Sequence, residues 1–438
     1  MIKRTIFVIF IILFVNQLFS KPYGLRETNK PFEFNITGQF NYTVINHEPF
    51  LQLVAIPEFT FGTIDFGFGF YIPLELNRDY QVRTIEYDGS LALMGKLYYL
   101  QYGKKDKSVI YIKASAIEDF TLGHGFIVQR YSNDLANQEI RKTGTHFQLN
   151  IDGFHFDGII GDIANQSVTG GRLAFRPGEM IGSKSTFLKS LEIGFTAVTD
   201  LSPKNREVVV VDSSITHRIR MRTGDSDSLF IYGADLSFTL IESSIINFGL
   251  YGEFAKINLA GEGIGYGIHG TFFPDSLGLN FKFQFRHLMN SFTPSYIDAY
   301  YDAYRSSKIN TINNQSAQYG WYVEISRYFL DKQVGVTIAY DEVFKGDFNP
   351  HLYISFHTYD LPKRVHFTFR YDRFGFEKWN HLFNVENLDS IFLFELLYGL
   401  TKNMEVGFTY RKGFILEESS SESLTKLVNI SVFTTVKF

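Results

Sequence analysis

The chain has 438 residues, a formal net charge of −4 and no cysteine. It contains 46 phenylalanines and 26 tyrosines, yet its mean hydropathy is only −0.06, so polar residues are interleaved with apolar ones. These values exclude disulfides and thiolate metal sites. They also provide no overall basic field of the kind that binds nucleic acid.

The first 20 residues have the layout of a secretory signal peptide. Lys3 and Arg4 precede an apolar run from residue 6 to residue 15, and the segment closes on the small residue Ser20. This run is shorter than a membrane-spanning helix requires, which disfavours the alternative of an uncleaved anchor. We therefore predict a signal peptide over residues 1–20 and a single unit over residues 21–438.

Residues 120–133, FTLGHGFIVQRYSN, allow two interpretations. The segment alternates apolar and polar residues as a strand does, but Gly123 and Gly125 flank His124 and a polar run follows, as in a loop. It is either a strand or a segment that folds inward from a loop. The longer stretch 120–144 is one of two candidates for an inward loop.

Two glycine- or aspartate-rich stretches resemble known ligand-binding motifs. Residues 261–267, GEGIGYG, have the glycine spacing of a nucleotide-binding loop, but strand-like sequence follows them instead of a helix. We interpret these glycines as easing strand bending or leaving space inside the fold. Residues 223–228, TGDSDS, lack the glycine and distal glutamate of a calcium loop. We therefore predict no metal site and no cofactor.

The second candidate for an inward loop is residues 291–315. This stretch is rich in Tyr, Ser and Asn, a composition suited to contacts with sugars or with a partner. Loops are commonly polar for ordinary reasons of solvation. We therefore interpret residues 291–315 as a solvated surface loop, with the inward arrangement as the alternative.

Several segments in the second half of the chain alternate with a period of two. In LNFKFQFRH (279–287), aromatic residues alternate with Lys282, Gln284 and Arg286, and residues 333–340, 364–372, 390–400 and 404–412 behave alike. Such alternation places the two sets on opposite faces of a sheet. Tight turns at 242–244, 274–276, 330–332, 360–362 and 401–403 alternate with longer segments at 201–228, 291–315, 345–349, 375–389 and 415–425.

The chain ends within a last alternating segment, LVNISVFTTVKF. Its apolar row consists of Val428, Ile430, Val432, Val436 and the terminal Phe438, with Thr434 as the one polar member. With this row the chain resembles the bacterial outer-membrane β-barrel proteins, and in particular porins. The last strand of those proteins commonly ends on phenylalanine, with alternating apolar residues before it. The barrel-assembly machinery recognises this row of residues. The resemblance implies that Val428, Ile430, Val432, Val436 and Phe438 form such an assembly signal.

The expected fold is therefore all-β. We predict a closed antiparallel transmembrane β-barrel of about 18 to 20 strands, with short periplasmic turns and longer extracellular loops. About 21 strand-like segments can be marked, whereas bacterial single-chain barrels have even numbers, so one segment is misread or missed, and residues 120–133 are the suspect. A soluble β-sandwich, propeller or solenoid is disfavoured, because its outer positions would not need so many aromatic residues and no long repeat is visible.

If the apolar rows face lipid, a set of charged residues faces the lumen. These pore-lining candidates are Arg172, Arg176, Lys282, Arg286, Glu324, Arg370, Asp372, Glu395, Glu405 and Arg411. Both signs of charge occur in comparable number, which predicts weak ion selectivity. The alternative is that these groups only pair across strands. Charge should be tolerated at inward positions such as Gln284 and Thr368, but not at Phe283 or Phe367.

The expected function is a porin-like channel for small solutes in the outer membrane of a diderm bacterium. The partners would be outer-membrane lipids, the barrel-assembly machinery and the solutes. The alternative is a surface-displayed adhesin or receptor, or a structural barrel whose loops bind a partner. We predict no enzyme: the 11 histidines show no spacing that fixes a nucleophile beside one of them, which disfavours an outer-membrane hydrolase.

Overall fold

A computed structural model describes most of the chain from residue 32 to residue 437. The described residues are 32–45, 48–76, 81–82, 96–133, 142–163, 167–203, 205–211, 216–222, 228–258, 260–274, 278–289, 291–312, 318–329, 334–344, 350–358, 365–376, 381–382, 390–401, 403–416 and 424–437. The predicted signal peptide and the terminal Phe438 lie outside them. Among the described residues, no helix has the length and apolar character of a membrane-spanning helix.

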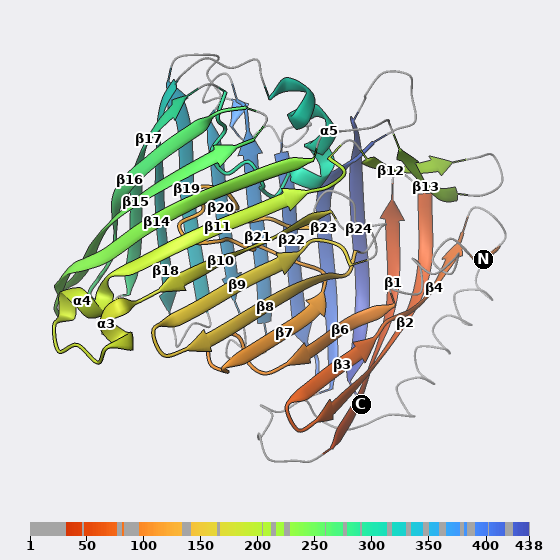
Figure 1. Ribbon diagram of the computed structural model, residues 1–438. Coiled ribbons are helices and arrows are strands. Elements are labelled where there is room, and N and C mark those ends of the chain that lie inside the picture. Colours follow the sequence, from red (N-terminus) through yellow and green to blue (C-terminus); the bar gives the residue numbers. More distant parts are fainter. Residues whose placement is uncertain are drawn as a thin grey trace.

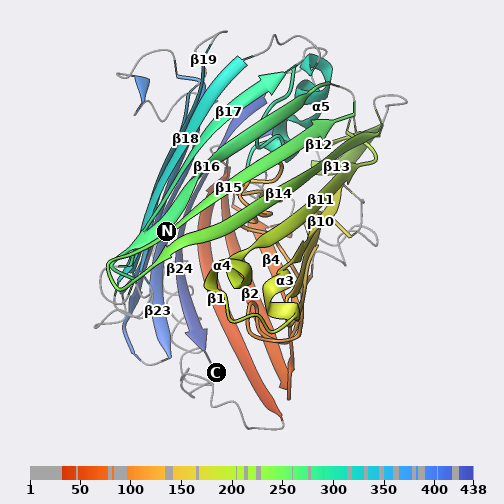
Figure 2. The same cartoon turned by 60° about the vertical axis from the view of Figure 1, so that its left-hand side comes forward.

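One large antiparallel sheet closes on itself (Figures 1 and 2). In the first half of the chain its strands are β1 Glu33–Ile45, β2 Glu48–Phe61, β3 Ile64–Phe68, β4 Phe70–Glu75, β5 Gln81–Val82, β6 Leu97–Tyr102, β7 Ile110–Ser115, β8 Gly144–Ile151, β9 Phe154–Ile160, β10 Val168–Phe175 and β11 Glu192–Asp200. In the second half they are β14 Leu229–Glu242, β15 Ile246–Ile257, β16 Glu262–Phe272, β17 Leu279–Met289, β18 Gln318–Phe329, β19 Val334–Phe344, β20 His351–Thr358, β21 Val365–Phe374, β22 Ser390–Gly399, β23 Met404–Leu416 and β24 Leu424–Lys437.

Within the described ranges, the sheet contains 22 strands at 20 positions around the ring. β3 and β4 share one position, because both pair with β2, and Gly69 separates them. β5 and β6 share the next position, where they pair with β4 and β3. The ring closes where β1 pairs with β24, from Thr37 opposite Lys437 to Ile45 opposite Asn429. The predicted closed antiparallel barrel of 18 to 20 strands is confirmed.

The connections differ at the two ends of the barrel. We call the end where β1 begins and β24 finishes the turn end, and the opposite end the loop end (Figure 1). Turns at the turn end are short, except for residues 176–191, which form helices α3 (Pro177–Met180) and α4 (Thr186–Ser190). The loop end carries the longer connections. One of these holds a separate hairpin of β12 (Asn205–Val211) and β13 (Thr216–Arg222), and another holds helix α5 (Tyr301–Thr311).

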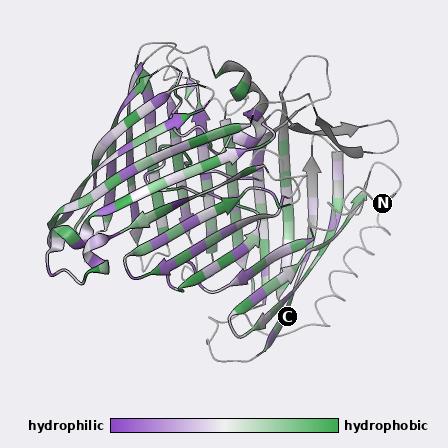
Figure 3. Ribbon diagram, in the orientation of Figure 1, coloured by the Kyte–Doolittle hydropathy of each residue, from purple (hydrophilic) through white to green (hydrophobic). Residues whose placement is uncertain are grey.

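Cross-strand pairing assigns each residue to one of two faces. Partners in a register share a face, so Lys282 opposite Glu324, and Glu324 opposite Ala339, trace one face from strand to strand. On the other face, large apolar side chains such as Phe283, Ile338 and Phe408 remain exposed. Figure 3 shows the resulting alternation of hydrophilic and hydrophobic residues along the strands. We call the face with Lys282 the inner face and the face with Phe283 the outer face.

Aromatic rings form rows on the outer face. Phe356, Phe367, Phe394 and Phe408 stand side by side across β20 to β23, with ring-centroid distances of 5.3, 5.2 and 6.0 Å. Cross-strand aromatic pairs of this kind stabilise a sheet beyond the area they bury. The outer face is therefore both apolar and continuous around these strands.

Candidate functional site

Two segments from the loop end fold into the barrel. We call residues 116–133, between β7 and β8, the lumen loop, and residues 291–312, which include α5, the mouth segment. The two pair in parallel at Val128 and Ile297. The N–H of Gln129 donates to the carbonyl of Ile297 at 3.0 Å, and the N–H of Ile297 donates to Ile127 at 3.2 Å. They therefore form one unit.

This arrangement corrects one expectation and decides another. Residues 291–315 were expected to be a solvated surface loop, but their described part, 291–312, packs inside the barrel. Residues 120–133 are not a barrel strand and belong to the inward alternative. Counting them as a strand gave the odd number of segments.

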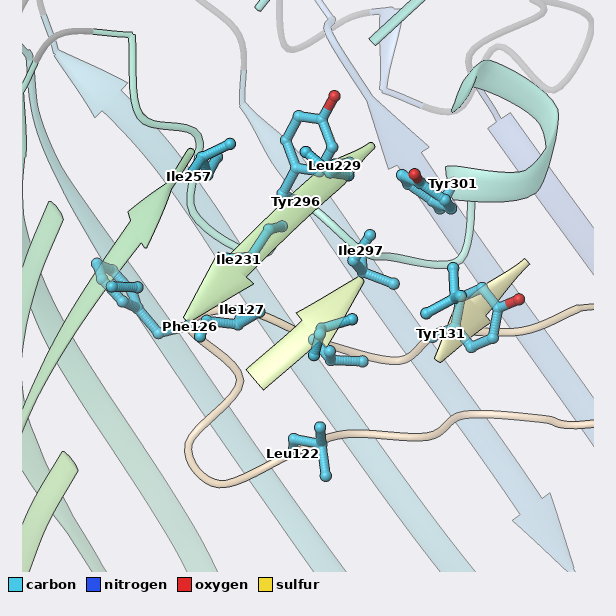
Figure 4. Packing of buried hydrophobic residues seen from close by; sticks show 14 of the residues in the cluster. Leu122, Phe126, Ile127, Tyr131, Leu229, Ile231, Ile257, Tyr296, Ile297 and Tyr301 are labelled. Atoms are coloured by element: carbon cyan, nitrogen blue, oxygen red, sulfur yellow. The ribbon is translucent and has the colours of Figure 1, made fainter. Parts of the chain in front are cut away.

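The inserted unit packs against one side of the barrel (Figure 4). Phe126, Ile127, Ile297 and Tyr301 belong to one buried cluster with residues of the inner face. The inner-face members are Ile159, Val168, Val198, Leu229, Ile231, Ala255, Ile257 and Leu288. They come from six strands between β9 and β17, near the loop end. The hydrophobic effect thus attaches the unit to this wall, as it would in a soluble core.

Glycines of β16 make room for the inserted unit. A Cβ atom at Gly263 would lie 2.5 Å from the ring of Phe292, and one at Gly265 would lie 3.2 Å from the ring of Phe126. Both distances are too short for an undisturbed side chain. The glycine-rich stretch 261–267 therefore leaves space inside the fold, one of the two roles inferred from the sequence.

The tip of the lumen loop is Gly123–His124–Gly125. Both glycines have positive φ, 56° and 86°, a conformation that glycine adopts without steric cost. The backbone carbonyl of His124 accepts a hydrogen bond from the ammonium of Lys282. The imidazole ring of His124 stacks on the ring of Tyr251, with the ring centroids 4.2 Å apart. Burial, reinforced by the charge of Lys282, lowers the pKa of His124 well below its ordinary value.

Arg130 attaches the other end of the lumen loop to β18 and β20. Its guanidinium forms an ion pair with Glu324 and donates to the hydroxyl of Tyr322 at 3.0 Å. The same group lies 3.9 Å from the ring centroid of Tyr353. A guanidinium can combine planar stacking and hydrogen bonding in this way, which an ammonium cannot. The loop thus reaches from β10, near Gly123, to β20.

α5 is held between two distant strands. Arg305 forms a bidentate ion pair with the fully buried Asp200 at the end of β11, at 2.6 Å, and the hydroxyl of Tyr301 donates to the same carboxylate at 2.8 Å. On the other side, the hydroxyl of Tyr300 donates to the carbonyl of Asp372 in β21 at 2.7 Å. Removing one partner of a buried ion pair costs about 3–5 kcal/mol.

Most of the charged residues singled out from the sequence lie on the inner face, where many are paired. Arg172 contacts Asp235 at 2.5 Å and Glu192 at 2.6 Å. Arg286 contacts Asp341 at 2.5 Å. Lys282 and Glu324 hold the lumen loop. These groups therefore make contacts within the protein, as the pairing alternative describes.

A second group of the candidates lies on β21, β22 and β23. Asp372 is buried and lies 2.5 Å from His351, whereas Arg370 is 3.5 Å from Asp372. Glu395, Glu405 and Arg411 are half-buried on the inner face, as their registers show. Arg176 lies beyond β10 at the turn end, where its exposed side chain contacts Glu192 at 2.9 Å.

Sequence reasoning missed several residues of the inserted unit. Arg130, Asp200, Asp302 and Arg305 make ion pairs there, with Lys142 contacting Asp302 at 2.7 Å. The partners are 105 to 194 residues apart, so no local spacing reveals them. Within the described part of the chain, no group of three or more His, Cys, Asp or Glu residues could hold a metal ion.

Comparison with known proteins gives no family. No protein-family model matches the chain, and no curated protein matches it. The fold does match solved structures. One is Pseudomonas aeruginosa OccK3 (OpdO), which is 10% identical in sequence, with a TM-score of 0.37. The match covers 93% of this chain and 95% of the OccK3 chain. A second is P. aeruginosa OpdL, which is 8% identical, with a TM-score of 0.36. This match covers 93% of this chain and 98% of the OpdL chain.

Acinetobacter baumannii OccAB4 is a third such structure. It has 8% identity and a TM-score of 0.34, and the match covers 94% of this chain and all of OccAB4. Similarity at this level does not carry a function from one protein to another. The function proposed below is therefore derived from the barrel itself.

Proposed function

We propose that the protein is a channel through which small solutes cross a bacterial outer membrane. The observation that carries the proposal is the closed ring of 20 strand positions with an apolar outer face and a polar inner face. A barrel of this strand number encloses more space than its own wall side chains fill. The lumen loop and the mouth segment narrow that space from one side.

The membrane setting follows from the outer face. The exposed aromatic and aliphatic side chains around the ring would contact lipid tails. Closure of the ring leaves no unpaired sheet edge in the membrane. With short turns at one end and long connections at the other, the loop end would be extracellular and the turn end periplasmic. Residues 1–20 would direct export, and lipids and the barrel-assembly machinery would be the partners.

Display of loops is the second candidate function. The β12–β13 hairpin favours it, because this hairpin forms its own sheet apart from the barrel. The inserted unit favours the channel instead, because segments that served display would project outward from the loop end. We therefore place conduction first, and we propose no hydrolase activity.

Conductance in planar bilayers tests the proposal. Purified protein should form stable channels, and liposomes that contain it should become permeable to small sugars, because a ring of 20 strand positions encloses more space than its wall side chains fill. The same protein after heat denaturation is the control. Bilayers that stay silent across a range of voltages, together with liposomes that neither swell nor leak, would contradict the channel and favour display.

A further inference from the structure

The connection between β10 and β11 is longer than its neighbours at the turn end and holds the helices α3 and α4 (Figures 1 and 2). We call residues 176–191 the turn-end segment. Resting on the membrane setting of the proposed function, we infer that this segment anchors the barrel in the adjacent leaflet of the membrane. Its exposed apolar side chains contact lipid tails, and Lys184 and Lys189 bind the phosphate groups of anionic phospholipids.

α4 covers the end of β14 that β11 does not reach. β14 continues to Glu242, but its pairing with β11 ends where Ser237 lies opposite Glu192. Past this point, the hydroxyl of Ser190 accepts a hydrogen bond from the backbone N–H of Thr239 at 3.0 Å. α4 thus takes the place of a neighbouring strand, because the backbone groups of a sheet edge need partners in lipid.

An aromatic contact places α4 on the outer face of the barrel. The ring of Phe187 packs against the ring of Phe238 at a centroid distance of 5.2 Å. Phe238 lies on the outer face, because it is an odd number of positions from the inner-face residue Ile231. Phe154 and Phe175 of β9 and β10 form a second outer-face pair near the turn end, 5.4 Å apart. α4 therefore continues the apolar outer face, at the level where barrels carry aromatic residues at the membrane interface.

The turn-end segment exposes large apolar side chains although its two helices already pack on each other. A Cβ atom at Gly178 of α3 would lie 2.1 Å from the carbonyl oxygen of Leu188 in α4, so the two backbones are in contact. Met180 and Ile181 are nevertheless 57% and 74% exposed, and Phe187 and Leu188 are 47% and 40% exposed. Covering the edge of β14 does not require these four side chains to be apolar, whereas insertion at the edge of a membrane does.

The charges of the turn-end segment complement an anionic surface. Lys184 and Lys189 are exposed, and no described side chain forms an ion pair with either of them. Arg176, by contrast, contacts Glu179 at 3.4 Å and Glu192 at 2.9 Å. The two lysines therefore place uncompensated positive charge beside exposed apolar side chains. A phospholipid surface matches both features, because its tails take up the apolar groups and its phosphates attract the ammonium groups.

Single cysteines that carry an environment-sensitive fluorophore can locate the segment, since the chain contains no native cysteine. In liposomes, the fluorophore on Ile181→Cys or Leu188→Cys of the full-length protein should be quenched by phospholipids with brominated tails. It should also emit at a shorter wavelength than the fluorophore on Lys105→Cys. Lys105, exposed in the short turn between β6 and β7 at the same end of the barrel, is the matched control and should not be quenched.

A comparison of headgroups tests the two lysines. Brominated phosphatidylglycerol, which is anionic, should quench the fluorophore on Leu188→Cys more strongly than the same mole fraction of brominated phosphatidylcholine. Lys184→Gln/Lys189→Gln should abolish this difference. Lys104→Gln/Lys105→Gln, the matched pair in the β6–β7 turn, should leave it unchanged. Equal quenching by the two lipids when both Lys184 and Lys189 are present would overturn the headgroup assignment.

The outcomes separate the anchor from the channel. Fluorophores on Ile181→Cys and Leu188→Cys that remain unquenched in a protein that folds and conducts would overturn the anchor and leave the channel function intact. Cross-linking of two copies through Leu188→Cys in place of quenching would also overturn it, because a second copy would then cover the surface. Quenching in a protein that inserts but does not conduct would support the anchor and contradict only the channel.

Discussion

His124 illustrates how a single residue depends on its surroundings in the lumen. Its imidazole stacks on Tyr251 and lies near Lys282, His269 and Arg172. Burial, reinforced by the positive charges of Lys282 and Arg172, lowers its pKa well below the ordinary value of 6.5. The docked loop therefore holds a neutral imidazole, whereas an undocked loop would take up a proton as the pH falls through about 6.5.

The sign of the pH effect follows from this difference. Because the undocked loop binds more protons below pH 6.5, docking is most favourable above that pH and weakens as the pH falls. We expect single-channel conductance or its noise to rise between about pH 7 and pH 5. His124→Gln, which cannot be protonated, should flatten the profile. Identical pH profiles for the wild type and His124→Gln would show that this residue is not involved.

At the scale of elements, an inserted segment must satisfy its backbone groups without joining the sheet. The lumen loop and the mouth segment do so by pairing with each other at Val128 and Ile297, and Lys282 supplies a donor to the carbonyl of His124. Unpaired backbone groups away from water are costly, so these contacts decide whether the segments remain inside. Apolar packing on the inner wall then fixes their position.

The two faces of a strand should differ in their tolerance of charge. Phe283 lies on the outer face, so Phe283→Arg should cost about 2–4 kcal/mol near the membrane midplane. Thr368→Arg, on the inner face of β21, should cost much less. Urea unfolding in detergent or lipid, followed by the heat-dependent gel shift, measures the difference. Equal losses at the two positions would mean that the faces are assigned the wrong way round.

Gln284 shows where the tolerance expected from sequence fails. It lies on the inner face, as the alternation predicts, but it is fully buried between Glu253 and Arg286. An arginine there could not accept the hydrogen bond from Arg286, and it would place a second guanidinium beside Arg286 in a fully buried position. We therefore expect Gln284→Arg to be destabilising, in contrast to the expectation from sequence alone.

For the whole molecule, closure is the decisive step. β24 pairs with β1 on one side and with β23 on the other, so the last strand completes the ring. The described members of the row proposed as the assembly signal, Val428, Ile430, Val432 and Val436, fall on the outer face, where Val432 is 55% exposed. An unclosed barrel would leave two sheet edges without hydrogen-bond partners in lipid.

Loss of the terminal residue tests the assembly signal. Deleting Phe438, or replacing Val432 with Asp, should sharply lower the amount of protein in the outer membrane, with the remainder degraded in the periplasm. Ser431→Asp, one residue away on the inner face, is the matched control and should assemble. Membrane fractionation with immunoblotting measures the outcome. Normal membrane levels after the deletion of Phe438 would argue against the signal.

The sequence by itself determined the class of fold, the faces of the strands and the two ends of the barrel. Side chains of a strand alternate between faces with a period of two, so Phe283 and Gln284 could be assigned to opposite faces from their order alone. Turn residues and segment lengths separated the short connections from the long ones. Both signals are local, so both can be interpreted without knowing which strands pair with each other.

Only the tertiary structure decided which inner-face residues are fully buried and which are half-buried. Arg305 meets Asp200 across 105 residues, and Arg130 meets Glu324 across 194. Such contacts depend on the register of the whole ring and on which loops fold inward. Alternation along a strand cannot predict either, because inner-face side chains have the same period of two whether they are fully buried in an ion pair, like Arg286, or half-buried, like Arg411.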